Sequence, residues 1–283
     1  MHMLKKVLRG IIPENLIQYV PSSFDIVGSR EKAVAIIQIP EELKSYEREI
    51  AKAIMSIHKN VKTVLAKESE RYGYYRIRRY RIILGDNDTE VYHKENGIIM
   101  KLDPRKVYFS PREGTERARI ARMVRPKENV MVMFAGIGPY ALNIVKFQPL
   151  VDKVIAIEIN PIAYEYMIEN IRLNKMEDKI IAIWGNVKQE SRRWYGFCDR
   201  VVMPLPKGAY KFLDKAFLSL KPSDGVIHFY YWSHEKNLFS DGYRFIEKTS
   251  ILYNKHVRII GLRKVLPYAP RIYKICIDFR ILD

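Results

Sequence analysis

The sequence predicts an α/β protein in two parts, a larger domain with a mostly parallel sheet preceded by a smaller α+β domain. From Asn129 onward, short apolar runs alternate with helical stretches, a rhythm typical of a parallel sheet covered by helices on both faces. Before that residue, several strand-like segments surround one amphipathic stretch. The length of 283 residues favours two domains over one.

The smaller part, residues 1–110, is expected to hold a helix and a sheet. Apolar residues from Glu41 to Ile57 recur at helical spacing after Pro40. Gly85-Asp86-Asn87-Asp88 indicates a turn between two strands. The expected strands are Phe24–Val27, Ala33–Ile39, Val61–Ala66, Tyr75–Leu84, Glu90–Lys94 and Ile98–Leu102. Strands around one helix predict a sheet with helices on one face.

The larger part, residues 129–283, follows an arginine-rich stretch that predicts a connecting helix within residues 111–128. Its expected parallel strands are Val130–Phe134, Val154–Glu158, Ile180–Trp184, Arg200–Met203 and Gly225–Tyr231. The helical stretches between and after them are Pro139–Phe147, Pro161–Leu173, Gly208–Leu220 and Glu235–Tyr253. Two further segments, Val257–Val265 and Ile272–Ile281, predict an antiparallel pair that closes the sheet.

The composition suggests a polyanionic partner and excludes several classes of protein. The formal net charge is +17, and the basic excess is spread over both parts of the chain. Because neutralising phosphates releases counterions, a basic chain rich in aromatic residues fits a nucleic acid. The longest apolar runs are too short for a membrane span. Two cysteines without a CxxC pattern argue against a disulfide framework or a zinc site and fit the cytoplasm.

A strand that runs into a glycine turn is the first sign of a ligand site. Val130–Phe134 is followed by Ala135-Gly136-Ile137-Gly138 and then by a helical stretch. Glycines let the backbone approach a ligand where a Cβ would clash. Glu158 ends the next strand, the place of a carboxylate that binds the ribose hydroxyls of a nucleoside.

The glycine spacing fits either NAD or S-adenosyl-L-methionine, and three features favour the second. Pro139 follows the second glycine and removes an N–H that a pyrophosphate would need. Glu158-Ile159-Asn160-Pro161, with Glu169-Asn170 in the next helix, is a methyltransferase pattern rather than a dehydrogenase pattern. Gly185-Asn186-Val187 follows the third strand, where a side-chain amide can face an adenine. An NAD-dependent oxidoreductase stays open as a distant alternative.

Five strings in collinear order resemble the Trm5 family of class I tRNA (guanine37-N1)-methyltransferases. They are Tyr108-Phe109-Ser110-Pro111-Arg112, Thr115-Glu116-Arg117, Met133–Tyr140, Ile159-Asn160-Pro161 and Met203-Pro204-Leu205-Pro206. The resemblance implies a Rossmann-like methyltransferase domain after an RNA-binding domain, S-adenosyl-L-methionine as cofactor, and G37 in the tRNA anticodon arm as target. The related wybutosine-pathway enzymes, which transfer an aminocarboxypropyl group or methylate a tricyclic wyosine precursor, are the nearest alternative.

The resemblance also implies roles for particular residues. Glu116 matches the general base that removes the N1 proton of guanine, and Arg76 matches the arginine that stabilises negative charge on O6. Arg112 and Arg117 match residues that support the site and bind phosphates. The implied cofactor contacts are Phe134, Ala135, Gly136, Gly138, Glu158, Ile159, Asn186, Val187 and Met203, and the implied base-positioning residues are Pro204, Leu205 and Pro206. The alternative for Glu116 is an ion pair on the helix surface with Arg112 or Arg119.

Three positions depart from the pattern of the family. Val132 stands where the family usually has an aspartate, so one hydrogen bond to the cofactor is missing or comes from elsewhere. Pro204 replaces an asparagine that helps to position the target base, and proline cannot donate. Glu113 stands where a leucine is common, which we interpret as a surface change. The departures at Val132 and Pro204 therefore concern cofactor binding and base reading, respectively.

Several expectations concern the partner. Residues 71–81 interleave arginines with tyrosines, which suits stacking on unpaired bases, although a half-buried strand would show the same alternation. His228, Tyr230, Tyr231 and Trp232 either line the base site or cap the core. We expect a cytoplasmic monomer without a metal or a membrane contact, and without the extra N-terminal domain of longer relatives. A non-catalytic tRNA-binding protein is a further alternative.

Overall fold

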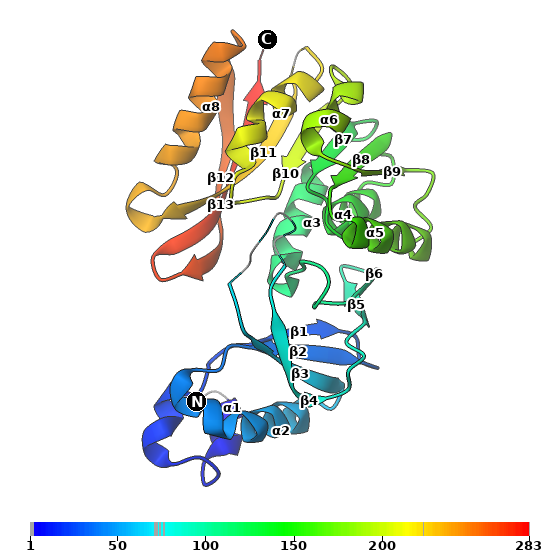
Figure 1. The fold of residues 1–283 in the computed structure, drawn as a ribbon. Helices are drawn as coiled ribbons and strands as arrows, with labels where there is room; N and C mark the ends of the chain where they lie inside the picture. Colours follow the sequence, from blue (N-terminus) through cyan, green and yellow to red (C-terminus); the bar gives the residue numbers. More distant parts are fainter. Residues whose placement is uncertain (1–2, 71–72, 74, 76, 223, 283) are drawn as a thin grey trace. The chain divides into compact units, whose positions relative to one another are not determined.

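The computed structural model describes residues 3–70, 73, 75, 77–222 and 224–282, which form two compact units (Figure 1). Unit 1 consists of Met1–Glu95 and Ile99–Pro111. Unit 2 consists of Asn96–Ile98 and Arg112–Asp283. Two hydrophobic core clusters of described residues lie in different units, so each unit buries apolar side chains of its own.

Unit 1 is built on a four-stranded sheet with the order β1-β2-β3-β4. The strands are β1 (Asp25–Gly28), β2 (Ala33–Ile37), β3 (Val61–Lys67) and β4 (Tyr80–Gly85), and the helices are α1 (Met3–Leu8), η1 (Glu14–Tyr19), η2 (Glu41–Tyr46) and α2 (Glu47–Ile57). β2 and β3 run parallel because η2 and α2 cross between them, and the other pairs are antiparallel. Leu4 of α1 and Ile50 of α2 share one core with the sheet.

The last strand of this sheet is shorter than the sequence predicts. The prediction begins the strand at Tyr75, but β4 begins at Tyr80, which pairs with Lys67, the last residue of β3. Beyond this pair, one further backbone hydrogen bond joins the two segments, from the Glu68 N–H to the Arg79 carbonyl at 3.0 Å. Arg71, Tyr72, Tyr74 and Arg76 of the basic and aromatic run lie outside the described residues. β5 (Val91–Glu95) and β6 (Ile98–Leu102) form a separate two-stranded sheet.

Unit 2 is built on a seven-stranded sheet with the order β12-β13-β11-β10-β7-β8-β9. The strands are β7 (Asn129–Met133), β8 (Lys153–Glu158), β9 (Ile180–Trp184), β10 (Arg200–Met203), β11 (Val226–His234), β12 (Val257–Ala269) and β13 (Ile272–Ile281). β7 to β11 run parallel, whereas β13 is antiparallel to both β11 and β12. The predicted mostly parallel sheet, closed by an antiparallel pair, is therefore confirmed.

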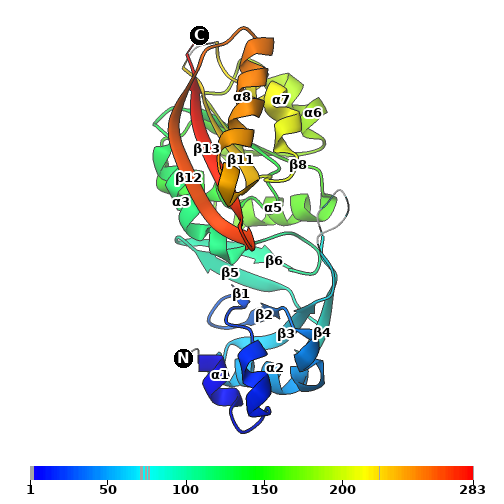
Figure 2. The ribbon, with the colours of Figure 1, turned by 90° about the vertical axis from the view of Figure 1, so that its left-hand side faces the viewer.

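Helices cover both faces of this sheet (Figures 1 and 2). One face carries α3 (Gly114–Met123), α4 (Pro139–Phe147) and α5 (Pro161–Leu173), and the other carries α6 (Val187–Glu190), α7 (Leu213–Ser219) and α8 (Ser240–Leu252). Short 3-10 helices, η3 (Pro111–Glu113), η4 (Ser191–Trp194), η5 (Ala209–Phe212) and η6 (Glu235–Asn237), join them.

The strand side chains of unit 2 alternate between the two faces. Met131 and Met133 pack with Leu213 of α7 and Ile246 of α8 in one core cluster. Val132, between the two methionines, points to the opposite face and is fully buried. Among the described helices, none has the length and hydrophobicity that a bilayer crossing requires.

Candidate cofactor and catalytic site

The order of the strands in unit 2 reverses between β7 and β10. From β7 the chain continues to β8 and β9 on one side, and it then returns to β10 and β11 on the other side. Open α/β sheets bind their ligands at such a reversal, outside the carboxyl ends of the strands. The glycine turn follows β7, and Pro204-Leu205-Pro206 follows β10. Both strings therefore lie at the expected ligand edge of the sheet.

The glycine turn has a backbone conformation that few residues adopt. Phe134 has a φ of 58°, Gly136 one of 57° and Gly138 one of 88°. Positive φ is unusual for an aromatic residue, and such strain is concentrated at functional sites. A Cβ on Gly138 would lie 3.1 Å from Met167 Cγ, whereas a Cβ on Gly136 would meet no described atom within 4 Å. The turn thus leaves an open approach to its backbone at Gly136.

Glu158 ties the end of β8 to the glycine turn. Its Oε2 accepts the Gly136 N–H at 2.7 Å, and its Oε1 accepts the Asn160 N–H at 2.8 Å. Burial raises the pKa of Glu158, and hydrogen bonds from backbone N–H groups oppose that shift. Each carboxylate oxygen has two lone pairs, so these two bonds leave acceptor capacity for hydroxyl groups.

The other expected cofactor residues lie at or just after the carboxyl ends of β7, β8, β9 and β10. Ile159 is half-buried beside Glu158. Asn186 is the N-cap of α6, and its side-chain oxygen accepts the Lys188 N–H at 2.9 Å. Val187 and Met203 belong to the hydrophobic core cluster, and Ala135 is also buried. Because these strands are parallel, the structure brings this group of residues to one edge of the sheet.

The loop after β10 is attached to the end of β11. Pro204, Leu205 and Pro206 are half-buried, and the Trp232 N–H donates to the Pro206 carbonyl at 3.3 Å. The Trp232 ring stacks on Tyr268 with 3.9 Å between centroids. Of the aromatic group at the end of β11, His228 and Tyr230 are fully buried, whereas Tyr231 and Trp232 are half-buried.

η3 and α3 place Arg112, Glu116 and Arg117 in different environments. Arg112, just before the helix, is exposed. Glu116 and Arg117 are buried, with 5% and 2% of their surfaces exposed. The alternative for Glu116, an ion pair on the helix surface, is therefore half correct, because its partner is Arg119 but the carboxylate is buried.

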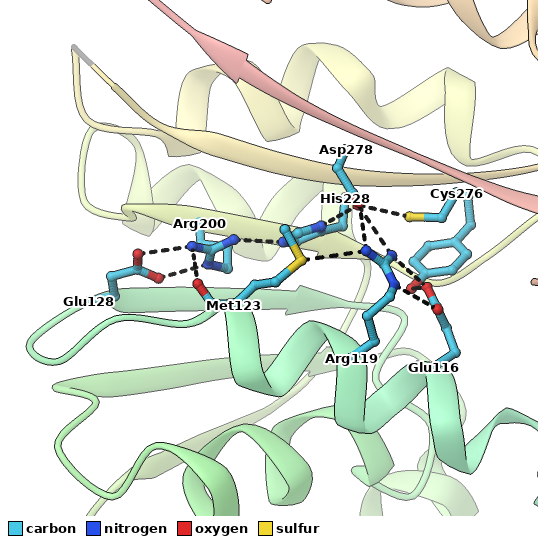
Figure 3. Close-up of polar contacts among 9 residues, drawn as sticks. Glu116, Arg119, Met123, Glu128, Arg200, His228, Cys276 and Asp278 are labelled. Atoms are coloured by element: carbon cyan, nitrogen blue, oxygen red, sulfur yellow. Dashed lines mark hydrogen bonds and ion pairs between the residues drawn. The ribbon is translucent and has the colours of Figure 1, made fainter. Parts of the chain in front are cut away.

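The Glu116 carboxylate accepts three hydrogen bonds (Figure 3). Its Oε2 accepts from Arg119 Nε at 2.8 Å, and its Oε1 accepts from Arg119 Nη2 at 2.7 Å. Oε1 also accepts the Tyr230 hydroxyl at 2.6 Å. Burial raises the pKa of Tyr230 well above its ordinary value, so the phenol keeps its proton and acts as the donor. The carboxylate is held by α3 and β11 together.

A chain of buried polar groups continues from Arg119 across the sheet (Figure 3). Arg119 Nη1 donates to Asp278 Oδ2 at 2.6 Å, and His228 Nδ1 lies 2.6 Å from Asp278 Oδ1. His228 Nε2 lies 2.7 Å from Arg200 Nη1. Arg200 in turn forms two hydrogen bonds with the Glu128 carboxylate, at 2.7 and 2.9 Å. With Glu116, these residues of α3, the loop before β7, and strands β10, β11 and β13 form one connected network.

The protonation of His228 follows from its neighbours. A guanidinium can only donate, so Nε2 accepts from Arg200 and the ring proton lies on Nδ1, where it donates to Asp278. Burial lowers the pKa of His228, and the Asp278 hydrogen bond opposes this shift only in part. His228 is therefore neutral at physiological pH.

The same cluster contains three side chains of types that ligate metals. His228, Cys276 and Asp278 place ligand atoms within 4.8 Å of one another. Burial raises the pKa of Cys276 well above its ordinary value, so it stays a thiol, whereas metal binding requires a thiolate. Arg119 and Arg200 already donate to Asp278 and His228. The arrangement is that of a hydrogen-bonded network rather than of a cation site.

Glu113 is not a surface residue, so the interpretation of this position as a surface change is wrong. Lys274 Nζ lies 2.7 Å from Glu113 Oε2, and only 3% and 5% of the two side chains are exposed. The ammonium also lies 4.7 Å from the centre of the Tyr230 ring. A carboxylate is tolerated at this buried position because β13 supplies a cation.

Arg76, the expected O6-stabilising residue, lies outside the described residues, so its role stays a prediction.

The sequence patterns indicate no role for Asp278, Arg200 and Glu128. A signal was present for Asp278, which is a charged residue in a buried apolar segment, Ile275–Phe279. Arg200 and Glu128 have no such local signal, because their contacts join residues that are distant in the sequence.

The fold and the site define a class of protein: a doubly wound α/β protein with a nucleoside-type ligand edge. Residues 91–260 match the model of the TRM5/TYW2 methyltransferase domain, and residues 4–89 match the model of the TYW2 N-terminal domain. The chain belongs to the TRM5/TYW2 methyltransferase family.

Relatives with two different activities match most of the chain. It is 43% identical to tRNA (guanine(37)-N(1))-methyltransferase Trm5b of Pyrococcus abyssi, over 95% of this chain and 78% of that protein. It is 32% identical to the tRNA(Phe) (4-demethylwyosine(37)-C(7)) aminocarboxypropyltransferase of Pyrococcus horikoshii, over 98% and 96%.

Two solved structures bear on the ligands of the family. The complex of aTrm5 with tRNALeu matches with a TM-score of 0.84 and 34% identity, over 98% of this chain and 78% of that one. Methanocaldococcus jannaschii TYW2 in complex with AdoMet matches with a TM-score of 0.71 and 28% identity, over 92% and 99%.

Proposed function

We propose that the protein transfers a methyl group from S-adenosyl-L-methionine to N1 of guanine 37 in the tRNA anticodon loop. The observation that carries this proposal is the 43% identity, over 95% of the chain, to an enzyme named for that reaction. The buried and fixed carboxylate of Glu116 supports it, because N1 of guanine is a poor nucleophile until its proton is removed.

The ligand edge of unit 2 fits S-adenosyl-L-methionine. The backbone at Phe134, Ala135, Gly136 and Gly138 provides the close approach that the cofactor needs, and no described atom fills the space beside Gly136. Glu158 would accept the ribose hydroxyls with its remaining lone pairs. Ile159, Asn186, Val187 and Met203 follow the neighbouring strands and complete the proposed adenosine and sulfonium contacts.

The chemistry divides between the cofactor and the protein. When bound, the cofactor supplies a methyl group on a sulfonium, which is a strong electrophile. Glu116 accepts the N1 proton, and Arg76 stabilises the negative charge that develops on O6.

The tRNA is positioned by basic residues and by the loop after β10. Arg112 is exposed and suits a phosphate contact, whereas Arg117 is buried and suits support of the site. Pro204 cannot donate from its backbone nitrogen, so the carbonyl groups of this loop are the groups offered to the guanine amine. Unit 1 and the net charge of +17 would add phosphate contacts over the anticodon arm.

A second activity is favoured by one observation. Residues 4–89 match the TYW2 N-terminal domain, and the aminocarboxypropyltransferase of Pyrococcus horikoshii matches over nearly its whole length. Transfer of the aminocarboxypropyl group, or methylation of a wyosine precursor, would use the same cofactor at the same tRNA position. We place methyl transfer to guanine first because of the higher identity to Trm5b.

One experiment separates these activities. Purified protein is incubated with S-adenosyl-L-methionine and with tRNA transcripts that carry G37 or A37, and the nucleosides are identified by mass spectrometry. We expect 1-methylguanosine from the G37 transcript only. Methylation of both transcripts would overturn the proposal. So would an aminocarboxypropyl product on a wyosine-precursor tRNA together with no methylated product from the G37 transcript.

Two expectations about the state of the protein belong to the same proposal. A reducing cytoplasm is supported by Cys198 and Cys276, which are both buried and unpaired. We also propose a monomer, which light scattering on the purified chain tests.

A further inference from the structure

We infer that Oε2 of Glu116 is the atom that receives the guanine proton, and that Arg119 is the positioning residue that presents it. This inference rests on the proposed function and deepens it. It assigns to Arg119 and its buried partners a task in proton abstraction, beyond holding α3 against the sheet.

The hydrogen bonds on Glu116 select the oxygen. Oε1 accepts from both Arg119 Nη2 and the Tyr230 hydroxyl, which together use its two lone pairs. Oε2 accepts from Arg119 Nε alone among the described residues. A carboxylate oxygen with a single hydrogen bond keeps one lone pair, so Oε2 can accept the proton on N1 without loss of an existing bond.

Arg119 is held on its other side by Asp278. Its Nη1 donates to Asp278 Oδ2 at 2.6 Å, and its Nη2 lies 3.3 Å from Asp278 Oδ1. The planar guanidinium therefore bridges two carboxylates, and it cannot rotate without breaking bonds to both. Asp278 is itself fixed by the His228 ring at 2.6 Å and by the Cys276 thiol at 3.2 Å.

Arg200 anchors the far end of the network to α3. It donates to His228 Nε2, which keeps the histidine neutral and its Nδ1 proton on Asp278. It also donates to the Met123 carbonyl, at the last residue of the helix that carries Glu116 and Arg119. The network thus fixes both the side chain of Arg119 and the end of its helix.

The proton transfer from N1 to Glu116 balances in bonds and electrons. When the proton moves from N1 to Oε2, the N1 electron pair forms the bond to the methyl carbon, and the electrons of the broken carbon–sulfur bond stay on sulfur. Because a guanidinium does not release its protons, the network positions the base and does not relay the proton.

Charged and titratable groups surround Glu116 from each element packed against it. They are Glu113, Arg117 and Arg119 before or on α3, Tyr140 on α4, Tyr230 on β11, and Lys274, Cys276 and Asp278 on β13. The two neutral tyrosines and the thiol do not change charge at physiological pH, because burial raises the pKa of each well above its ordinary value. Among these neighbours, Arg119 forms the most hydrogen bonds with the Glu116 carboxylate, so its substitution tests the inference most directly.

The test is single-turnover methylation of a G37 transcript by Arg119→Lys, measured across pH, with the affinities for S-adenosyl-L-methionine and tRNA measured separately. Lysine keeps the charge but cannot bridge two carboxylates. We expect the rate constant to fall on the order of 10²-fold, with both affinities within about threefold of wild type. The low-pH limb of the rate profile should move to higher pH, because the charged carboxylate loses hydrogen bonds. Arg122→Lys, on the same helix but exposed over Phe147, is the matched control and should change neither.

A second pair of variants covers the case in which Arg119→Lys does not fold. Tyr230→Phe removes one hydrogen bond from Oε1 and should shift the low-pH limb in the same direction with a smaller loss of rate. The control Tyr243→Phe, on α8, should change neither. Normal rates and an unmoved limb in both site variants would overturn the inference, as would a lower active fraction with an unchanged rate constant. Absence of 1-methylguanosine with wild-type protein would instead overturn the proposed function, and the inference with it.

Discussion

The buried ion pair between Glu113 and Lys274 allows a stability prediction whose size follows from the structure. Substitution of Lys274 by methionine removes the cation and leaves the Glu113 carboxylate, with 5% exposure, without the ammonium at 2.7 Å. Breaking one side of a buried pair costs about 3–5 kcal/mol, because the remaining charge stays desolvated. We therefore expect Lys274→Met to lower the free energy of unfolding by about that amount.

Urea unfolding followed by tryptophan fluorescence measures this change. The three tryptophans, Trp184, Trp194 and Trp232, all lie in unit 2, so the signal reports the unit that contains the pair. Lys221→Met is the matched control, because Lys221 also lies 2.7 Å from its partner, Asp199, but 43% and 28% of these side chains are exposed. The control should cost less than about 1 kcal/mol.

A double variant completes the cycle. Addition of Glu113→Leu to Lys274→Met removes the buried carboxylate that has lost the lysine ammonium, so it should recover part of the lost stability. Equal losses for Lys274→Met and Lys221→Met would refute the reasoning, because burial would then have no effect on the strength of the pair. No recovery in the double variant would show that Glu113 itself is not the source of the cost.

Two further predictions concern the tRNA and the pH dependence of stability. Arg112→Ala should weaken tRNA binding and reduce the salt dependence of that binding by about one phosphate contact, while cofactor binding stays unchanged. Filter binding at several salt concentrations measures this change. An unchanged salt slope would show that Arg112 does not contact the tRNA. Burial lowers the pKa of His228 in the folded chain, whereas a histidine in the unfolded chain has a pKa of about 6.5. As the pH falls below that value, the unfolded chain binds a proton that the folded chain does not bind. The free energy of unfolding is therefore highest above that pH and decreases as the pH falls. His228→Asn should therefore flatten the decline in unfolding free energy between pH 7 and 5, by up to about 1.4 kcal/mol per pH unit, and an unchanged slope would contradict a neutral buried His228.

The sequence is most informative where one local pattern determines an element. Pro139–Phe147 and Pro161–Leu173 are helices with the predicted bounds, because each begins at a proline in the first turn and continues with apolar residues at helical spacing. β7 and β8 are apolar runs buried on both faces, which the sequence displays directly. α1 is missed because six residues are too few to show a period.

The candidate site is less visible in the sequence, because its polar contacts join distant segments. The motifs indicate Glu116 and the glycine turn, but they do not show that Arg119 and Tyr230 hold the carboxylate. The pairing of Glu113 with Lys274 joins η3 to β13, and no local pattern connects these residues. A buried charge was therefore mistaken for a surface change. Contacts of this kind need the tertiary structure.

The central claim is that Glu116 removes the N1 proton of guanine 37 before methyl transfer. The most direct measurement is the single-turnover rate of 1-methylguanosine formation by wild-type protein and by Glu116→Gln, with S-adenosyl-L-methionine affinity and urea stability measured on the same preparations. We predict wild-type formation of 1-methylguanosine, and for Glu116→Gln a loss of rate on the order of 10²–10⁴-fold with cofactor affinity nearly unchanged. A Glu116→Gln variant that methylates at the wild-type rate, or that loses cofactor binding instead of the chemical step, would contradict the account.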